Sequence, residues 1–182
     1  DTATPFVNIL NACPDLTDRT LVLNGVSKAY SMTGWRIGYA GGPAAVIKAM
    51  KKIQSQSTSN PTSISQVAAQ AALDGPQDCI GEMLTAFKER HDFVVDALNA
   101  IPGIDCLPTD GTFYVFPEVS GLIAHIDGVG NDLELAEYLI EQAGVALVPG
   151  SAFGLEGCAR ISIATSRDNL EQALARIAAV AA

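Results

Sequence analysis

Basic residues are scarce in this chain of 182 residues, which has 11 lysines and arginines against 20 aspartates and glutamates and a formal net charge of −9. Nucleic-acid binding requires clustered basic side chains that neutralise phosphates. Lys48, Lys51 and Lys52 form the only cluster of three basic residues, and we interpret them as one solvated helix face. The sequence therefore predicts no nucleic-acid partner.

Long apolar runs are also missing, because no segment approaches the roughly 18 residues that a membrane span requires. Hydrophobic residues nevertheless make up 48% of the chain and charged residues only 17%, a composition that can bury a large core. No signal-peptide pattern is visible at the N-terminus. We expect a cytoplasmic protein with no membrane partner.

Metal-ligand and disulfide patterns are lacking as well. The cysteines, Cys13, Cys79, Cys106 and Cys158, lie far apart and form no CxxC pair. We expect four reduced, mostly buried thiols, as is typical of cytoplasmic proteins, with two disulfides in an exported protein as the alternative. Neither histidine has a partner at ligand spacing, so no metal site is expected, and His91 lies in a charged helical stretch where we expect it to be exposed.

The hydrophobic pattern changes along the chain. Two short β-rich runs, Arg19–Val26 and Arg36–Gly42, precede three segments with helical periodicity. Short strand-like runs then alternate with helices that have recognisable caps, namely Asn131 and Gly144 for one helix and Ser166 for the last. The expected helices cover residues 43–53, 63–73, 77–101, 131–144 and 166 onward, and the later strands cover 103–107, 111–116, 145–150 and 158–164. This order predicts a partial α/β domain followed by a smaller α+β domain.

The segment Asn24–Pro43, NGVSKAYSMTGWRIGYAGGP, combines a lysine and an arginine with five glycines. Lys28 follows a strand that we expect to be buried, and Arg36 stands eight positions later. A neutral lysine amine can hold an aldehyde covalently, and an arginine fork can bind a phosphate in bidentate geometry. This pairing suits pyridoxal phosphate, although the spacing alone also fits two surface charges that flank a turn.

The run SKAYSMTGWRIGYAGGP resembles the cofactor-lysine segment of the fold-type I, class I/II aminotransferases, in the branch that includes prokaryotic aspartate aminotransferases. The resemblance implies that Lys28 forms the Schiff base with pyridoxal phosphate and that Arg36 binds the cofactor phosphate. Ser27 is a further candidate for a phosphate contact. Many relatives place that hydroxyl three residues before the lysine, where this chain has Gly25.

Three later segments match the same family in order, namely GTFYVFP at 111–117, VALVPGSAFG at 145–154 and ARISIATS at 159–166. The resemblance assigns the substrate α-carboxylate to Arg160 and a substrate-side aromatic to Phe113. Each of these two residues could instead have a purely structural role. Arg160 would be a strand-edge arginine paired with an acidic neighbour, and Phe113 would be a core aromatic.

The family fold implies that residues 1–60 are a remnant of the cofactor-binding large domain and that residues 61–182 form the small C-terminal domain with its connecting helices. The family's aspartate for the pyridine nitrogen lies further before the lysine than the 27 residues available here, and Asp1 does not fit because the following tyrosine position would be Thr4. We therefore expect the C-terminal portion of a longer enzyme, inactive alone, which would also explain the missing initiator Met.

The implied function is pyridoxal-phosphate-dependent transamination between an L-amino acid, with aspartate as the leading candidate, and a 2-oxo acid, in a full-length homodimer. Alternatives on the same scaffold are a β-lyase and a cofactor-sensing domain of a transcription regulator. A cofactor-free remnant that serves as an interaction module is a third alternative, and the intact Lys28, Arg36 and Arg160 argue against it.

Overall fold

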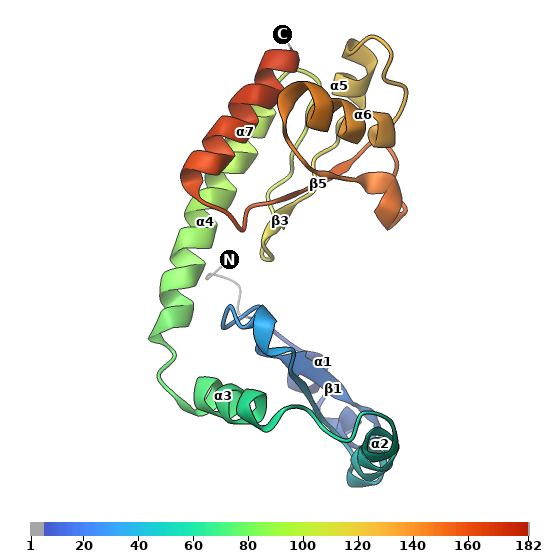
Figure 1. The fold of residues 1–182 in the computed structure, drawn as a ribbon, viewed down its shortest axis with the longest axis vertical. Coiled ribbons are helices and arrows are strands. Elements are labelled where there is room, and N and C mark those ends of the chain that lie inside the picture. The colour runs from blue at the N-terminus through green and yellow to red at the C-terminus, as the bar shows by residue number, and fades with distance from the viewer. Residues whose placement is uncertain (1–5, 182) are drawn as a thin grey trace. The chain divides into compact units, whose positions relative to one another are not determined.

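The computed structural model describes residues 6–181. It divides into two compact units, one that ends at Met83 and one that begins at Leu84, and Figure 1 draws the elements of both. The domain boundary predicted after residue 60 stays a prediction. Within the described residues, no helix is both long enough and apolar enough to cross a membrane.

The first unit contains a two-stranded sheet between short helices. Strands β1 and β2 pair antiparallel, with Val22 opposite Gly41 and Gly25 opposite Gly38. A Cβ atom on Gly38 would lie 3.0 Å from the carbonyl oxygen of Asn24, so glycine allows the close approach of the two strands. The elements are α1 (Ile9–Ala12), η1 (Pro14–Arg19), β1 (Val22–Gly25), η2 (Thr33–Trp35), β2 (Gly38–Gly41), α2 (Ala44–Ser57) and α3 (Ser63–Asp74).

The expectation that the first strand is buried is wrong for this chain. Leu23 is 70% exposed and Tyr39 is 43% exposed, and in the described part of this unit only Val26 and Ala69 are buried. The physical reason is that a two-stranded ribbon cannot bury its own faces without a further packed layer.

The second unit holds the main hydrophobic core. Its three strands are antiparallel and β5 lies in the middle, with Val115 opposite Ile161 and Val148 opposite Arg160. Helix α7 runs alongside α4 (Figure 1), and residues of both helices join the buried cluster. The elements are α4 (Asp78–Asn99, which starts in the first unit), β3 (Tyr114–Val115), α5 (Ser120–His125), α6 (Asp132–Tyr138), the π-helical turn η3 (Leu139–Ala143), β4 (Val148–Pro149), η4 (Gly150–Phe153), β5 (Ala159–Ser162) and α7 (Arg167–Val180).

The predicted helix caps are confirmed. The Asn131 side chain accepts the Glu134 N–H at 2.9 Å, and the Ser166 hydroxyl accepts the Asn169 N–H at 3.2 Å. Gly144 ends η3 with φ +63°, the left-handed conformation that glycine adopts easily.

The strand predictions are less accurate than the helix predictions. The strand expected over 103–107 is reduced to an isolated bridge between Asp105 and Glu118. Helix α5 was not predicted, because it is short and has Gly121 in its first turn. That glycine is required, since a Cβ atom there would lie 2.6 Å from the Cα atom of Gly103.

Two expectations about single side chains need correction. His91 is not exposed, because only 12% of its side chain is accessible. Its Nε2 accepts the Thr109 N–H at 3.0 Å, so the ring connects α4 to the segment before β3. All four cysteines are free, as expected, but only Cys106 and Cys158 are buried, while the other two are exposed.

Candidate active site

Lys28 and Arg36 lie on one loop, the connection between β1 and β2 at residues 26–37. The loop starts from Val26, whose side chain is fully buried. The Tyr30 N–H then donates to the Val26 carbonyl at 3.3 Å, and the Ser31 N–H donates to the Lys28 carbonyl at 3.2 Å. These bonds form a turn in which Ser27 is half-buried and the Lys28 side chain is exposed.

Side chains of the loop also contact the first turns of α4 and the segment before it. The Tyr30 hydroxyl donates to Gln77 Oε1 at 2.8 Å, and the Ser31 hydroxyl contacts the Met83 sulfur at 3.3 Å. Gln77 in turn donates to the Gly75 carbonyl at 2.7 Å. Tyr30 and Ser31, which follow Lys28 in the chain, therefore attach the turn to residues 77 and 83.

Arg36 follows the short η2 helix and has φ +49°, a left-handed backbone conformation that is uncommon for a side chain of this size. Its Nη1 donates to the Thr33 carbonyl at 3.1 Å. A guanidinium has five N–H donors, so this bond orients the side chain and leaves donors for an anion.

The chemistry of this loop fits a phosphate-bearing aldehyde. Lys28 supplies an amine that can bind the aldehyde, and Arg36 supplies permanent charge and several donors for the phosphate. Ser27 adds a hydroxyl in the same turn. The loop closes between Gly25 and Gly38, where an added Cβ atom would crowd the opposite strand. The roles of Ser27, Lys28 and Arg36 stay predictions, and the loop brings all three together.

Arg160 lies in the second unit, in the middle strand β5 rather than at a sheet edge. Its guanidinium carbon is 4.3 Å from the ring centroid of Tyr114 and 4.7 Å from that of Phe153. Among residues 6–181, no carboxylate forms an ion pair with it. The alternative of a strand-edge arginine with an acidic partner is therefore wrong for the described residues. The Arg160 guanidinium instead contacts two aromatic rings.

Phe113, the predicted substrate-side aromatic, comes just before β3. It is half-buried and packs against the hydrophobic core, with its ring centroid 4.3 Å from that of Tyr114 and 6.4 Å from that of Phe87. Its substrate role stays a prediction. The sequence placed Tyr114 and Phe153 in segments that match the family but did not connect either ring with Arg160. The strand register makes that connection for Tyr114, and the fold of the η4 loop makes it for Phe153.

The loop that carries Phe153 is held by a buried carboxylate. Asp132 is only 3% exposed and accepts the Ser151 N–H at 2.6 Å through Oδ2. Burial alone would raise the pKa of Asp132, but hydrogen bonds from Ser151 and Gly157 outweigh it, so the pKa lies below its ordinary value of 3.8. Asp132 therefore holds the loop as a charged acceptor.

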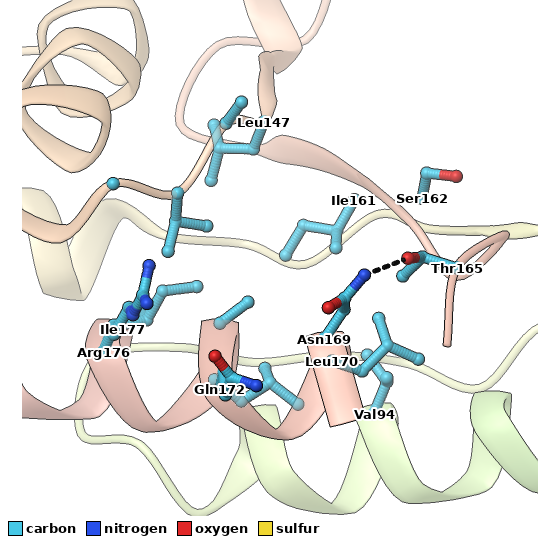
Figure 2. A pocket seen from close by; sticks show the side chains of 15 residues that line it. Val94, Leu147, Ile161, Ser162, Thr165, Asn169, Leu170, Gln172, Arg176 and Ile177 are labelled. Carbon is cyan, nitrogen blue, oxygen red and sulfur yellow. Dashed lines mark hydrogen bonds between the residues drawn. The ribbon is translucent and has the colours of Figure 1, made fainter. Parts of the chain in front are cut away.

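A cavity of about 600 Å³ opens between α7 and the segment before β4, away from these residues. Figure 2 shows that its lining combines apolar side chains, such as Leu147 and Ile161, with Asn169 and Arg176. The Asn169 amide donates to the Thr165 hydroxyl at 2.9 Å. None of the predicted site residues lines this cavity.

The comparisons with known proteins agree on one family. The family model for aminotransferase class I and II matches residues 3–177. An aspartate/prephenate aminotransferase of Nitrosomonas europaea is 59% identical over 180 residues, which are 96% of this chain and 45% of the relative. The crystal structure of the Rhizobium meliloti aspartate aminotransferase superimposes with a TM-score of 0.92 at 52% identity and covers 97% of this chain and 45% of that one.

An aspartate aminotransferase structure from Thermotoga maritima gives a TM-score of 0.83 at 40% identity, covering 96% of this chain and 43% of that chain. The chain thus spans somewhat less than half the length of the relatives it matches. These enzymes depend on pyridoxal phosphate, so both the resemblance and the cofactor expected from the sequence are confirmed at the level of the family. The chain belongs to the class I and II aminotransferases and has the mixed helix and sheet structure of their fold-type I architecture.

Proposed function

We propose that this chain supplies the C-terminal part of an aminotransferase that moves the amino group of an L-amino acid to a 2-oxo acid. The observation that carries the proposal is that Lys28 and Arg36 occupy one loop closed by paired glycines. The names of the relatives favour aspartate as the amino donor, and the Nitrosomonas relative is also named for prephenate. The remaining groups of the site, including an aspartate for the pyridine nitrogen, would come from outside this chain.

In this proposal Lys28 binds the cofactor aldehyde, and Arg36, assisted by Ser27, binds the phosphate. When bound, pyridoxal phosphate supplies an electron sink for the charge that develops at the substrate Cα. The freed Lys28 amine would take the proton from the substrate Cα as a general base and deliver it to the former aldehyde carbon of the cofactor as a general acid.

Arg160 holds the substrate α-carboxylate through paired N–H donors and so fixes the direction of the Cα–H bond. Correct orientation of reacting groups is a large part of enzymatic rate enhancement. Phe113 supplies an aromatic ring on the substrate side of the site in this proposal. Every amino acid has an α-carboxylate, so Arg160 selects the class of substrate and other residues select its side chain.

A β-lyase on the same scaffold would release pyruvate and ammonia, whereas an aminotransferase would convert 2-oxoglutarate or prephenate into the corresponding amino acid. A transcription regulator would bind DNA and catalyse neither the lyase reaction nor amino transfer. We infer a homodimer in the cytoplasm for the complete protein. The four free cysteines support the cytoplasmic location.

The test uses the complete protein with Lys28→Ala and the matched control Lys48→Ala, since Lys48 is an exposed lysine on α2. We expect Lys28→Ala to abolish the visible absorbance of lysine-bound cofactor and to lower amino transfer from aspartate by at least about 100-fold. Lys48→Ala should change neither. Retention of both signals in Lys28→Ala would contradict the proposal.

A further inference from the structure

We propose that Phe153 is a positioning residue for Arg160, because its ring contacts the guanidinium and sets the direction in which Arg160 presents its donors to a carboxylate. This inference rests on the proposed role of Arg160 and adds a second residue, from a different element, to that site.

The contact geometry is that of a cation–π pair. The Arg160 guanidinium carbon lies 4.7 Å from the Phe153 ring centroid and 4.3 Å from the Tyr114 centroid, both within the roughly 6 Å over which such attraction acts. Tyr114 comes from β3, whose place is set by the sheet. Phe153 comes from η4, outside the sheet, so its contact is an additional constraint on the arginine.

Phe153 is not placed by burial in the core, because 51% of it remains exposed. It is held instead by its loop and by one other aromatic ring. The Gly150 N–H donates to the Cys158 carbonyl at 2.7 Å, and the Asp132 carboxylate accepts the Ser151 N–H. Phe116 lies edge-on to the Phe153 ring at 6.1 Å between centroids. The ring therefore has a defined position while one side stays open to solvent.

Aromatic contacts suit an arginine that must bind a substrate carboxylate. The donors of a guanidinium lie in its plane, so a ring that stacks on the face leaves them available for bidentate binding. A protein carboxylate in the same place would occupy those donors and cancel the charge. Within the described residues Arg160 has no such partner, so the rings hold it without neutralising it.

The experiment compares Phe153→Leu, which removes the ring, with Phe153→Trp, which keeps an aromatic face, in the complete cofactor-loaded protein. Binding of maleate, used as a simple carboxylate probe, is measured by calorimetry, and KM and kcat are measured with aspartate. Leu155→Ala is the matched control, because Leu155 is a 54% exposed apolar residue two positions further along the loop.

We expect Phe153→Leu to raise both the maleate Kd and the aspartate KM by about threefold to tenfold, with kcat changed by less than about twofold. Phe153→Trp and Leu155→Ala should stay within about twofold of the parent protein for all three constants. The inference is overturned if Phe153→Leu changes neither binding constant, if the control weakens binding equally, or if tryptophan fails to restore binding.

Arg160→Gln separates this inference from the proposed function. If Arg160→Gln leaves maleate binding intact, the carboxylate role of Arg160 fails, and the role of Phe153 fails with it. If Arg160→Gln weakens binding but Phe153→Leu does not, only the inference about Phe153 is wrong. In the Arg160→Gln background, Phe153→Leu should have almost no further effect on maleate binding, since residues that act through one contact are not additive.

Discussion

Arg160 on β5 lies diagonally across the strand pair from Tyr114 on β3, with 4.3 Å between the guanidinium carbon and the ring centroid. Tyr114 is directly opposite Ser162, two positions from Arg160. Diagonal neighbours in an antiparallel pair are within reach of long and aromatic side chains. The strand register, more than the local sequence around Arg160, therefore places the Tyr114 ring beside it.

Substitution of Tyr114 should separate its ring from its hydroxyl. We expect Tyr114→Phe to retain maleate binding within about twofold, because the aromatic face over Arg160 remains. Tyr114→Leu should weaken binding by about twofold to fivefold, corresponding to about 0.5–1 kcal/mol for an exposed cation–π contact. Calorimetric titration of the complete protein measures both. If Tyr114→Phe binds as weakly as Tyr114→Leu, the hydroxyl and not the ring supports the site.

Helices α2, α3, α4, α6 and α7 and the loop that carries Lys28 and Arg36 were predictable from sequence because their signals are local. Asn131 and Ser166 act within one turn of the helices that they cap, and Lys28 and Arg36 stand in one continuous motif. The short strands were predicted too long, because only the register of distant segments decides which residues pair. The contacts of Tyr114 and Phe153 with Arg160 were not predicted either, since each ring reaches Arg160 from another part of the chain.

The stability of the second unit should depend strongly on the packing of α4 and α7 in its hydrophobic core. Leu98 on α4 is fully buried in the cluster that includes residues of α7. Leu98→Ala should lower the free energy of opening of this unit by about 2–5 kcal/mol, the usual cost of such a cavity. Hydrogen exchange of the α4 and α7 amides in the complete protein measures this. The control Leu133→Ala, at a 53% exposed position, should cost less than about 0.5 kcal/mol, and an equal loss in both variants would contradict the prediction.

Cysteine labelling should divide the four thiols into two classes. Burial, with a smaller effect from the charge of Asp105, raises the pKa of Cys106 to about 11. Burial also raises the pKa of Cys158. Because the thiolate is the reactive form, we expect both to remain unlabelled by iodoacetamide at about pH 8 until urea is added, while Cys13 and Cys79 react in the folded chain. Peptide mass spectrometry reads each site, and rapid native labelling of Cys106 would show that its surroundings open readily.

The carboxylate of Asp132 should make the Phe153 loop sensitive to acid. Its pKa is lower in the folded protein than its ordinary value of 3.8, so its stabilising effect is present above that value and is lost as the pH falls through the lower, folded-state pKa. Asp132→Asn should therefore increase hydrogen exchange of the loop at neutral pH, and the difference from the parent protein should shrink below about pH 4. Asp127→Asn, at an exposed position, is the control and should leave the loop unchanged. A difference that stays constant with pH would mean that Asp132 holds the loop by its shape alone and not by its charge.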